Sequence, residues 1–334
     1  MSLASLGEFG LIELIKNSFD VPSGIKGIGD DCAVIPQVTG LDTLISTDML
    51  VEGIHFIRSD ISAFDLGWKS AAVNFSDIAA MGGRPTGSFL SFALPRELDE
   101  AWIMEFIEGF RKMSEQAGDV PIATGSGACV PLLGGDTTAS PGIICINVTV
   151  TGECRHGSAK LRSAAEVGDL VCVSGPLGDS AAGLQIVLDR QQNKECQDAV
   201  DKEIESYLLN RHYHPLPRVS EALSLSGNEG VHAMMDISDG LASDLMHILK
   251  ASGKGAVIDL PSIPLSSQMS GYCSIRGLDR YALAAGGGED YELLFTMEPS
   301  CRPSVPCHVI GRICEGNAIE WKGGSRDYKG FRHF

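Results

Sequence analysis

The sequence predicts an α/β or α+β protein. Helix-like and strand-like hydrophobic patterns alternate along all 334 residues, which is typical of helices packed on sheets. Hydrophobic residues make up 44% of the chain and charged residues 21%, a globular composition. The length suits two ordinary domains or one large one. A polar stretch rich in Gly, Ser and Arg at 152–168 favours two, with the boundary between 1–151 and 152–334.

In the first half, apolar residues recur at helical spacing, and alternating or continuous apolar runs indicate strands. Asp65 is expected to be the N-cap of one helix and Gly82 its C′ residue. In the last strand, Ile146, Val148 and Val150 share one face, as in a half-buried strand. The helices expected span 8–19, 65–82 and 99–117. The strands expected span 32–36, 42–47 and 143–151.

The second half repeats this alternation. A buried strand at 170–174 precedes a glycine-containing turn and a helix that ends near Arg190. A helical pair is expected over 199–226, followed by a strand, a turn and a helix over 231–252 that stops at Gly253. The remaining strands expected span 256–259, 292–297 and 307–313.

The charge balance limits the partners. The formal net charge is −17, so we expect neither nucleic acid nor an anionic membrane as a general partner. The alternative is that this acidity serves solubility alone. Any phosphate chemistry on so acidic a chain requires cations between protein and phosphate.

The chain carries no sign of export. Its ten cysteines include no CxxC pair, and such a composition favours a reducing cytosol. The N-terminus has neither the basic start nor the apolar core of a signal peptide. No run of 18 apolar residues occurs, so no membrane span is expected.

Acidic residues cluster beside small residues at several expected element ends. Mg²⁺ prefers carboxylate and water oxygens and completes its shell with substrate phosphates, and glycine lets backbone approach closely. These clusters therefore point to a metal-dependent phosphate site. They are GIGDDCAV (27–34), STDMLVEGIHF (46–56), NFSDIAAMGG (74–83), GGDTT (134–138), MDISDGLASD (235–244) and GGGEDYELLF (286–295).

Each cluster also has a purely structural interpretation. Asp beside Gly is usually a turn residue, which applies to Asp30, Asp31 and Asp48. Ser238 or Asp239 makes a good helix N-cap. Ser70, Asn74 and Asp77 instead form a polar stripe on a helix, which has the character of a pocket wall or of a capped surface.

Familiar nucleotide and hydrolase motifs are absent from the sequence. No GxxxxGK[ST] loop, GxGxxG fingerprint or protein-kinase signature occurs. The eight histidines form no HExxH pair, and there is no GxSxG elbow. A kinase with this sequence belongs to another lineage.

Taken together, the clusters resemble the thiamine-monophosphate kinase family, in the superfamily typified by aminoimidazole-ribonucleotide synthetase. The likeness runs from GEFGLI (7–12) to GFRHF (330–334) through DLGWKSAAVNFSDIAAMGG, SGPLGDSAAGL, DISDGLASDLMHI and GGEDYELLFT. It implies ATP-dependent phosphorylation of thiamine monophosphate, several Mg²⁺ ions with K⁺ as a further candidate, and a two-domain fold. It also implies a homodimer in which the N-terminal sheets pair into a barrel.

The resemblance assigns site residues position by position, with Asp77, Asp136 and Arg162 in the catalytic role. The implied metal ligands are Asp31, Ser46, Thr47, Asp48, Asp77, Asp136, Asp236 and Asp239, with Asp30 ranked second to Asp31. The implied ATP contacts are Gly135, Asp136, Arg162 and Ser238. The implied substrate contacts are His55, Glu289 and Phe331.

Two features depart from the family pattern. The segment 120–132 is longer than the usual link into GGD. It is a candidate lid or surface loop. Ile107 stands where some members place an ATP-contacting tyrosine.

The implied reaction needs no general base, because a phosphate monoester with a second pKa of about 6 is already ionised at neutral pH. We therefore expect direct in-line transfer without a phosphoenzyme. Arg162 could add positive charge to the transition state or be a surface cation.

Alternative functions are selenophosphate or aminoimidazole-ribonucleotide synthesis, and regulation by a non-catalytic metal- or nucleotide-binding protein. Residues 1–27 lack the reactive cysteine that a selenophosphate enzyme would need. A hydrogenase-maturation relative would end in a cysteine-bearing tail, whereas this chain ends in His333 and Phe334.

Overall fold

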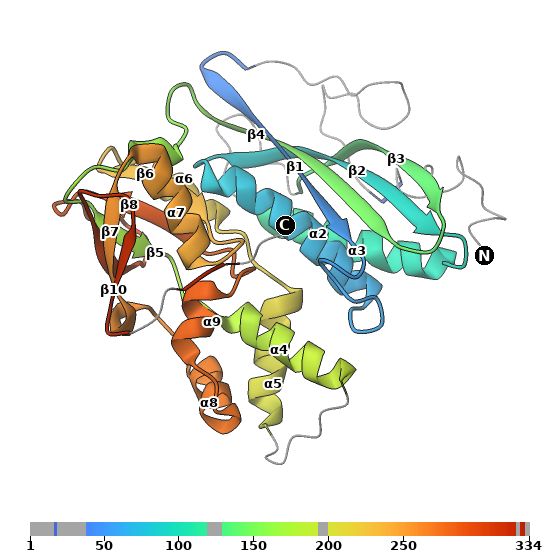
Figure 1. The fold of residues 1–334 in the computed structure, drawn as a ribbon. Helices are drawn as coiled ribbons and strands as arrows, with labels where there is room; N and C mark the ends of the chain where they lie inside the picture. Colours follow the sequence, from blue (N-terminus) through green and yellow to red (C-terminus); the bar gives the residue numbers. More distant parts are fainter. Residues whose placement is uncertain (1–16, 19–37, 119–128, 193–199, 325–327, 331–334) are drawn as a thin grey trace. The chain divides into compact units, whose positions relative to one another are not determined.

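A computed structural model describes residues 17–18, 38–118, 129–192, 200–324 and 328–330 (Figure 1). The chain divides into two compact units: Met1–Ile78 with Gly83–Gly157, and Ala79–Gly82 with Ser158–Phe334. The expected helix at 8–19 and strand at 32–36 lie outside the described residues, except for 17–18. No described helix is both long and apolar enough to cross a membrane.

The N-terminal unit contains a four-stranded sheet in the order β1-β4-β2-β3. The pair β2 and β3 is parallel, and the other pairs are antiparallel. The sequence patterns gave no strand at β2 or β3. The strands are β1 (Leu41–Val51), β2 (Arg84–Pro95), β3 (Leu132–Ser140) and β4 (Cys145–Arg155).

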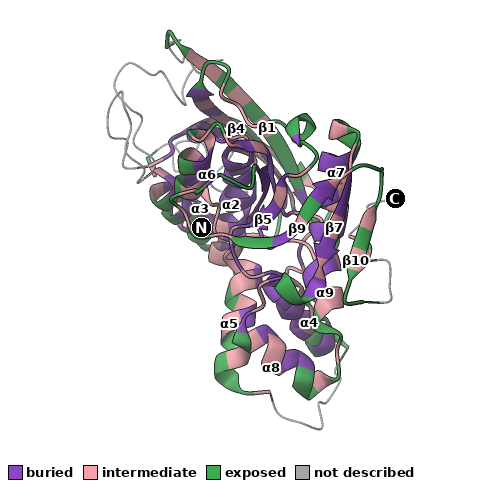
Figure 2. Cartoon of the chain, turned by 90° about the vertical axis from the view of Figure 1, so that its left-hand side faces the viewer, coloured by how far each residue is buried: buried purple, intermediate pink, exposed green. Residues whose placement is uncertain are grey.

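Two helices, α2 (Ala63–Ala80) and α3 (Glu100–Gly118), lie along one face of this sheet (Figure 1). Ile146, Val148 and Val150 of β4 are fully buried, as their alternation predicts. Figure 2 shows α2 mostly in the colour of buried residues. The opposite face of the sheet carries more of the exposed positions.

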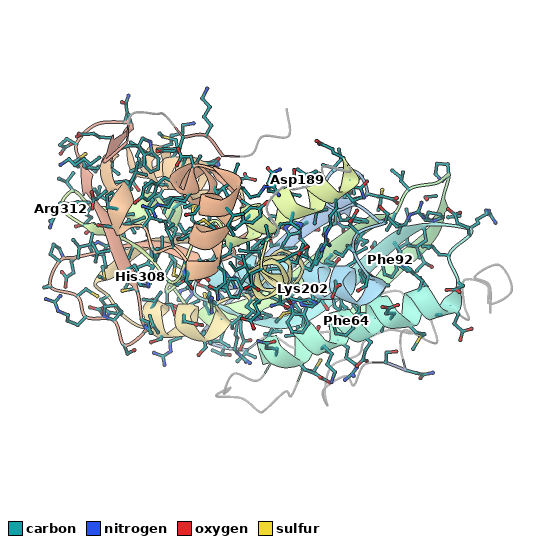
Figure 3. All side chains as sticks on the ribbon, turned by 90° about the horizontal axis from the view of Figure 1, so that it is seen from below. Phe64, Phe92, Asp189, Lys202, His308 and Arg312 are labelled. Carbon is teal, nitrogen blue, oxygen red and sulfur yellow. The ribbon has the colours of Figure 1, made fainter. Side chains whose placement is uncertain are left out.

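Two glycines let the helices touch. A Cβ at Gly67 of α2 would lie 1.9 Å from the carbonyl oxygen of Phe106. A Cβ at Gly109 of α3 would lie 1.9 Å from the carbonyl oxygen of Phe64, which is labelled in Figure 3. The helix backbones therefore meet where neither can carry a side chain.

The N-cap of α2 is not the residue expected from the sequence. The cap is Ser62, whose Oγ accepts from the backbone N–H of Asp65 at 3.0 Å, and Asp65 lies inside the first turn. The end of the helix agrees with the sequence pattern. Gly82 has φ 73°, and its N–H donates to the carbonyl of Ala79 at 2.7 Å, a left-handed helix end.

The C-terminal unit contains a six-stranded sheet in the order β10-β7-β9-β5-β8-β6. The pair β7 and β10 is parallel, and the remaining neighbours are antiparallel. Strand β10 was not expected from the sequence. The strands are β5 (Leu170–Val173), β6 (Val231–Asp236), β7 (Gly255–Asp259), β8 (Leu293–Met297), β9 (His308–Cys314) and β10 (Ile319–Lys322).

Helix α7 packs its apolar side on the sheet, and α4, α5 and α8 pack against one another. The core joins Val171 and Val173 of β5 to Leu241, Leu245 and Ile248 of α7, all at most 2% exposed. Helices α8 and α9 were not expected. The helices are α4 (Asp179–Gln191), α5 (Lys202–Tyr213), α6 (Val219–Ser226), α7 (Leu241–Ser252), α8 (Ser267–Arg276) and α9 (Arg280–Gly286), with short 3₁₀ turns η1 (Arg162–Ala164) and η2 (Leu260–Ser262).

Buried carboxylates tie these helices to the sheet. Glu292 is fully buried and lies between two guanidinium groups, at 3.1 Å from Nη2 of Arg211 and 2.8 Å from Nε of Arg218. Ser174 Oγ donates to the same carboxylate at 2.6 Å. A buried charge is tolerable only with such partners, so α5 and α6 are held against the start of β8.

Asp290 is buried with fewer partners. Its carboxylate accepts from the backbone N–H groups of Gly178 at 2.7 Å and Ser180 at 3.4 Å, at the start of α4. Burial raises the pKa of Asp290 to about 8, against a usual value of 3.8. Between these two values the folded chain holds a proton that the unfolded chain releases.

We predict that the raised pKa of Asp290 makes the folded state less stable at higher pH. Because the folded pKa is the higher one, the free energy of unfolding falls as pH rises from 4 to 8. In Asp290→Asn the fall should be smaller, by on the order of 1 kcal/mol per pH unit. Urea denaturation at several pH values measures this, with Glu320→Gln, an exposed change of equal charge, as the control. Equal pH slopes in the wild type and Asp290→Asn would contradict the assignment.

Candidate functional site

Strand β1 and helix α2 bring several predicted residues together in the N-terminal unit. Ser46 Oγ donates to Asp77 Oδ2 at 2.5 Å. The backbone N–H of Asp48 donates to Asn74 Oδ1 at 3.2 Å. These contacts fix β1 to α2 at the point where two carboxylates and a hydroxyl gather.

The strand register explains this gathering. Ser46 and Asp48 pair with Val150 and Val148 of β4, which face the helices, and paired residues share a face. Ser46 and Asp48 therefore point to the same side as α2. Thr47 points to the other face, where its Oγ1 lies 3.0 Å from Thr149 Oγ1.

The polar stripe of α2 divides into two kinds of residue. Ser70 is fully buried, and its Oγ donates to the carbonyl of Leu66 at 2.7 Å. This hydrogen bond lies within α2. Asn74 is also fully buried, and its amide oxygen reaches β1. Asp77 is half-buried, and its carboxylate accepts the hydroxyl of Ser46.

Asp136 lies elsewhere in the same unit. It is exposed on β3, and its Oδ1 accepts from the N–H of Thr137 at 2.9 Å. Gly135 precedes it, and a Cβ there would lie 1.8 Å from the carbonyl oxygen of Leu90. Only glycine allows β3 to approach β2 so closely at this point.

Asp136 and Asp48 occupy opposite edges of the sheet. Asp136 pairs with Ser91, Ser91 with Asn147, and Asn147 with Met49. Three strand spacings of about 4.8 Å separate the two edges, or about 14 Å in all. The pairing also places Asp136 on the face of Met49, opposite to that of Asp48. One copy of the chain therefore does not bring Asp136 to the cluster of Ser46, Asp48 and Asp77.

His55 lies in the turn after β1. The backbone N–H of Val51 donates to His55 Nδ1 at 3.0 Å, which fixes the ring and leaves Nε2 as the protonated nitrogen of the neutral form. The adjacent Glu52 accepts from the N–H of Ile144 at 2.8 Å. The turn is thus tied to the start of β4.

In the C-terminal unit, a buried carboxylate shapes the loop between β6 and α7. Asp244 Oδ2 accepts from the N–H groups of Ser238 at 3.0 Å, Asp239 at 3.1 Å and Gly240 at 3.0 Å. The helix cap is Gly240, without a side-chain cap. Ser238 and Asp239 are therefore not the N-cap, and both remain half-exposed beside the buried Asp236.

Three side chains converge at this loop. Ligand atoms of Asp239, Asp244 and His247 lie within 4.8 Å of one another. Burial, followed by the charges of Asp236 and Asp239, raises the pKa of Asp244 to about 8. Burial and then the positive charge of Arg162 lower the pKa of His247.

Arg162 is held next to α7 through its backbone. Ser252 Oγ, in the last turn of α7, donates to the carbonyl of Arg162 at 2.9 Å and accepts from the N–H of Ala165 at 3.1 Å. The Arg162 side chain is exposed. The C-terminal unit therefore presents Asp239, His247 and Arg162 together.

Glu289 belongs to the same unit and follows a glycine run. Its φ is 63°, and that of Tyr291 is 51°, both left-handed and costly for residues with side chains. The N–H of Glu289 donates to the carbonyl of Ser238 at 2.8 Å. The Glu289 segment and the Ser238 loop thus form one backbone-linked structure.

Three of the predicted positions cannot be located. Asp30, Asp31 and Phe331 lie outside the described residues.

Two histidines beside the candidate site residues, His247 and His212, were not predicted from the sequence. His247 lies one turn after Asp244 in α7, and that spacing was a signal that could have found it. His212, which neighbours Glu289 in the fold, gives no local signal, because 77 residues separate them in the sequence.

The donor atoms decide which ion fits. Ser46, Asp48 and Asp77 offer only oxygen, on a strand and a helix that hydrogen bonds hold together. That set fits Mg²⁺, which prefers oxygen ligands. The group at Asp239 fits less well, since it includes an imidazole and one Asp244 oxygen already accepts three N–H groups.

Comparison with known proteins covers both units. Residues 29–154 match the family of AIR synthase related proteins, N-terminal domain, and residues 166–321 match the corresponding C-terminal domain. The Escherichia coli K12 thiamine-monophosphate kinase is 38% identical, over 98% of each chain.

Solved structures agree with this comparison. AaThiL, in complex with AMPPCP and TMP, is 35% identical and aligns with a TM-score of 0.78 over 100% of this chain and 99% of that one. The thiamine-monophosphate kinase of Stenotrophomonas maltophilia K279a is 34% identical, with a TM-score of 0.76 over 94% of each. Sequence and fold agree over nearly the full length, and the chain belongs to the thiamine-monophosphate kinase family of AIR synthase related proteins.

Proposed function

We propose that this chain phosphorylates thiamine monophosphate to thiamine diphosphate, with ATP as the phosphoryl donor. The observation that carries the proposal is the full-length similarity to thiamine-monophosphate kinases, joined to the oxygen cluster of Ser46, Asp48 and Asp77. Both substrates carry negatively charged phosphate groups, and the chain has a net charge of −17. The binding of either substrate therefore depends on cations held by carboxylates.

The reaction requires little proton transfer by protein side chains. The acceptor phosphate has a second pKa of about 6 and is already ionised at neutral pH. The protein's work is to align two anions and to offset their charge. Bound Mg²⁺ would supply Lewis-acid neutralisation of the phosphate oxygens, with K⁺ as a further candidate cation.

The N-terminal unit supplies rigid oxygen ligands. Asp77 is held by Ser46, and the Asp48 backbone is held by Asn74, so the Asp77 carboxylate and the Asp48 backbone are already positioned before substrate binds. Preorganised charge of this kind is what stabilises a phosphoryl-transfer transition state. The metal ligands we assign are Asp31, Ser46, Thr47, Asp48, Asp77 and Asp136 of this unit, together with Asp236 and Asp239 of the C-terminal unit.

The C-terminal unit supplies contacts to the substrates. Arg162 is exposed beside α7, where its guanidinium can bind phosphate oxygens. Glu289 offers a carboxylate to the cationic part of thiamine monophosphate. The nucleotide contacts we assign are Arg162 and Ser238 of this unit with Gly135 and Asp136 of the N-terminal unit. The contacts with thiamine monophosphate are Glu289 and Phe331 of this unit with His55 of the N-terminal unit.

The position of Asp136 supports a site shared between two copies of the chain. In one copy Asp136 lies about 14 Å from the edge that bears Asp48, by strand spacing. Among the described residues β1 and β3 are the edge strands. On β1, Ile45 is 70% exposed and Met49 is 56% exposed. Edge-to-edge pairing of two sheets into a barrel would cover these side chains and bring Asp136 of one copy to β1 of the other, on the face that carries Thr47 and Met49.

We predict that Asp77→Asn lowers kcat/KM by at least ~10²-fold, because it removes preorganised charge from the transition state. A coupled ADP assay with ATP and thiamine monophosphate measures this. Glu105→Gln makes the same charge change on the exposed side of α3 and should keep wild-type activity. Asp77→Asn that folds normally and retains more than a tenth of the activity would refute the role of Asp77.

A second prediction concerns the shared site. Asp77→Asn and Asp136→Asn should each be inactive, but a dimer with one copy of each has one intact site. Random mixing makes about half of the dimers mixed, so about a quarter of the wild-type activity should return. Co-expression, with native mass spectrometry to count mixed dimers, provides the test. Mixed dimers without activity would show that Asp136 acts within its own chain.

A third prediction concerns the path of the phosphoryl group. Direct in-line transfer inverts the configuration at phosphorus, because no enzyme-bound phosphate intervenes. ATP made chiral at the γ-phosphorus, followed by stereochemical analysis of the thiamine diphosphate, reports this. Net retention would indicate two displacements and a phosphoenzyme.

A further inference from the structure

Glu289 lies in a strained backbone segment whose conformation depends on contacts with neighbouring elements. Glu289 and Tyr291 both have left-handed φ values, 63° and 51°, which are unfavourable for residues with side chains. Between them, Asp290 is anchored to the start of α4. A Cβ at Gly288 would lie 2.3 Å from the carbonyl oxygen of Ser238. The strain is therefore maintained by contacts on both sides of the segment.

One of these contacts reaches the Glu289 side chain itself. His212, in the last turn of α5, is only 6% exposed, and its Nδ1 lies 3.4 Å from Glu289 Oε2. The same Nδ1 lies 3.1 Å from Ser180 Oγ of α4. Ser180 in turn donates its backbone N–H to Asp290. A single ring nitrogen thus links α4, α5 and the Glu289 carboxylate.

The location of His212 is fixed independently of Glu289. Helices α4 and α5 meet at Gly183, where a Cβ would lie 2.4 Å from the carbonyl oxygen of Leu208 and 2.8 Å from Cβ of His212. The neighbouring Arg211 is anchored to the buried Glu292 at 3.1 Å. The ring is therefore preorganised before any substrate binds, as a residue that orients another must be.

The Glu289 carboxylate is the more exposed partner of this pair. Its side chain is 28% exposed, against 7% for that of His212, so part of it is accessible from solvent. Thiamine monophosphate carries a cationic thiazolium ring and an aminopyrimidine, and a carboxylate suits both. An unrestrained Glu side chain would lose rotamer freedom on binding, and the contact with His212 removes part of that cost.

We infer that His212 is a positioning residue, which orients the Glu289 carboxylate for the acceptor substrate and takes no part in binding ATP. This inference rests on the proposed function, in which Glu289 contacts thiamine monophosphate. It assigns acceptor recognition to a buried helix residue that touches neither substrate. Loss of His212 should therefore weaken the binding of thiamine monophosphate and leave the binding of ATP unchanged.

The test is steady-state kinetics of the full-length chain with each substrate varied in turn. His212→Leu replaces the ring with an apolar side chain, and it should raise the KM for thiamine monophosphate about tenfold, as expected for the loss of one polar contact with a charged group. The KM for ATP should stay within about twofold, a difference too small to represent a lost hydrogen bond. His212→Asn places an amide nitrogen near the position of Nδ1 and should restore most of the acceptor affinity.

A matched control separates positioning from stability. His232 also pairs with a carboxylate, Asp169, through Nδ1 at 2.9 Å, and it lies in neither proposed contact set. His232→Leu should leave both KM values unchanged, and thermal unfolding of all variants reports their folding. If His212→Leu raises both KM values together, or leaves the KM for thiamine monophosphate unchanged, the inference is wrong.

A double-mutant comparison distinguishes this inference from the function beneath it. In a Glu289→Gln background, His212→Leu should add little to the KM for thiamine monophosphate, since the two act as one unit. An equal increase in both backgrounds would overturn the inference while leaving the proposed kinase intact. Absence of ATP consumption by the wild type with thiamine monophosphate would remove the function and the inference with it.

Discussion

Repulsion between like charges is the constraint on which this structure depends. A chain of net charge −17 has to accept two phosphorylated substrates, and its predicted site is built mainly from carboxylates. Without cations, every additional Asp near the phosphates would weaken binding. The arrangement is reasonable only if the carboxylates hold metal ions, and the oxygen donors of Ser46, Asp48 and Asp77 suit that task.

The same constraint is met differently where no metal is needed. Glu292 is neutralised by Arg211 and Arg218, whereas Asp244 and Asp290 accept backbone N–H groups at the start of a helix. Their raised pKa values show that these donors only partly offset burial. These internal carboxylates hold the loops that carry Ser238, Asp239 and Glu289, so buried charge here positions exposed charge.

Much of this organisation could be predicted from local sequence. Helix α2 followed from its periodic apolar residues and from Gly82, although its cap is Ser62 and not Asp65. Strand β3 was missed because its sequence, LLGGDTTAS, has no alternating apolar side, and its glycines satisfy a close approach to β2 that only the fold reveals. The residue types of the candidate site were visible in the sequence. Their distribution over opposite sheet edges depends on strand order, which the local pattern does not encode. The contact of His212 with Glu289 depends on the packing of α4 against α5 and was equally inaccessible.

The most direct measurement of the central claim is ³¹P NMR of the purified chain with ATP and thiamine monophosphate, with and without Mg²⁺. We expect ADP and thiamine diphosphate to form in equal amounts when Mg²⁺ is present, and both to stop forming after chelation. Formation of thiamine diphosphate at the same rate in the presence of chelator would contradict the requirement for a metal ion. ADP release at the same rate with and without thiamine monophosphate would contradict its role as phosphoryl acceptor.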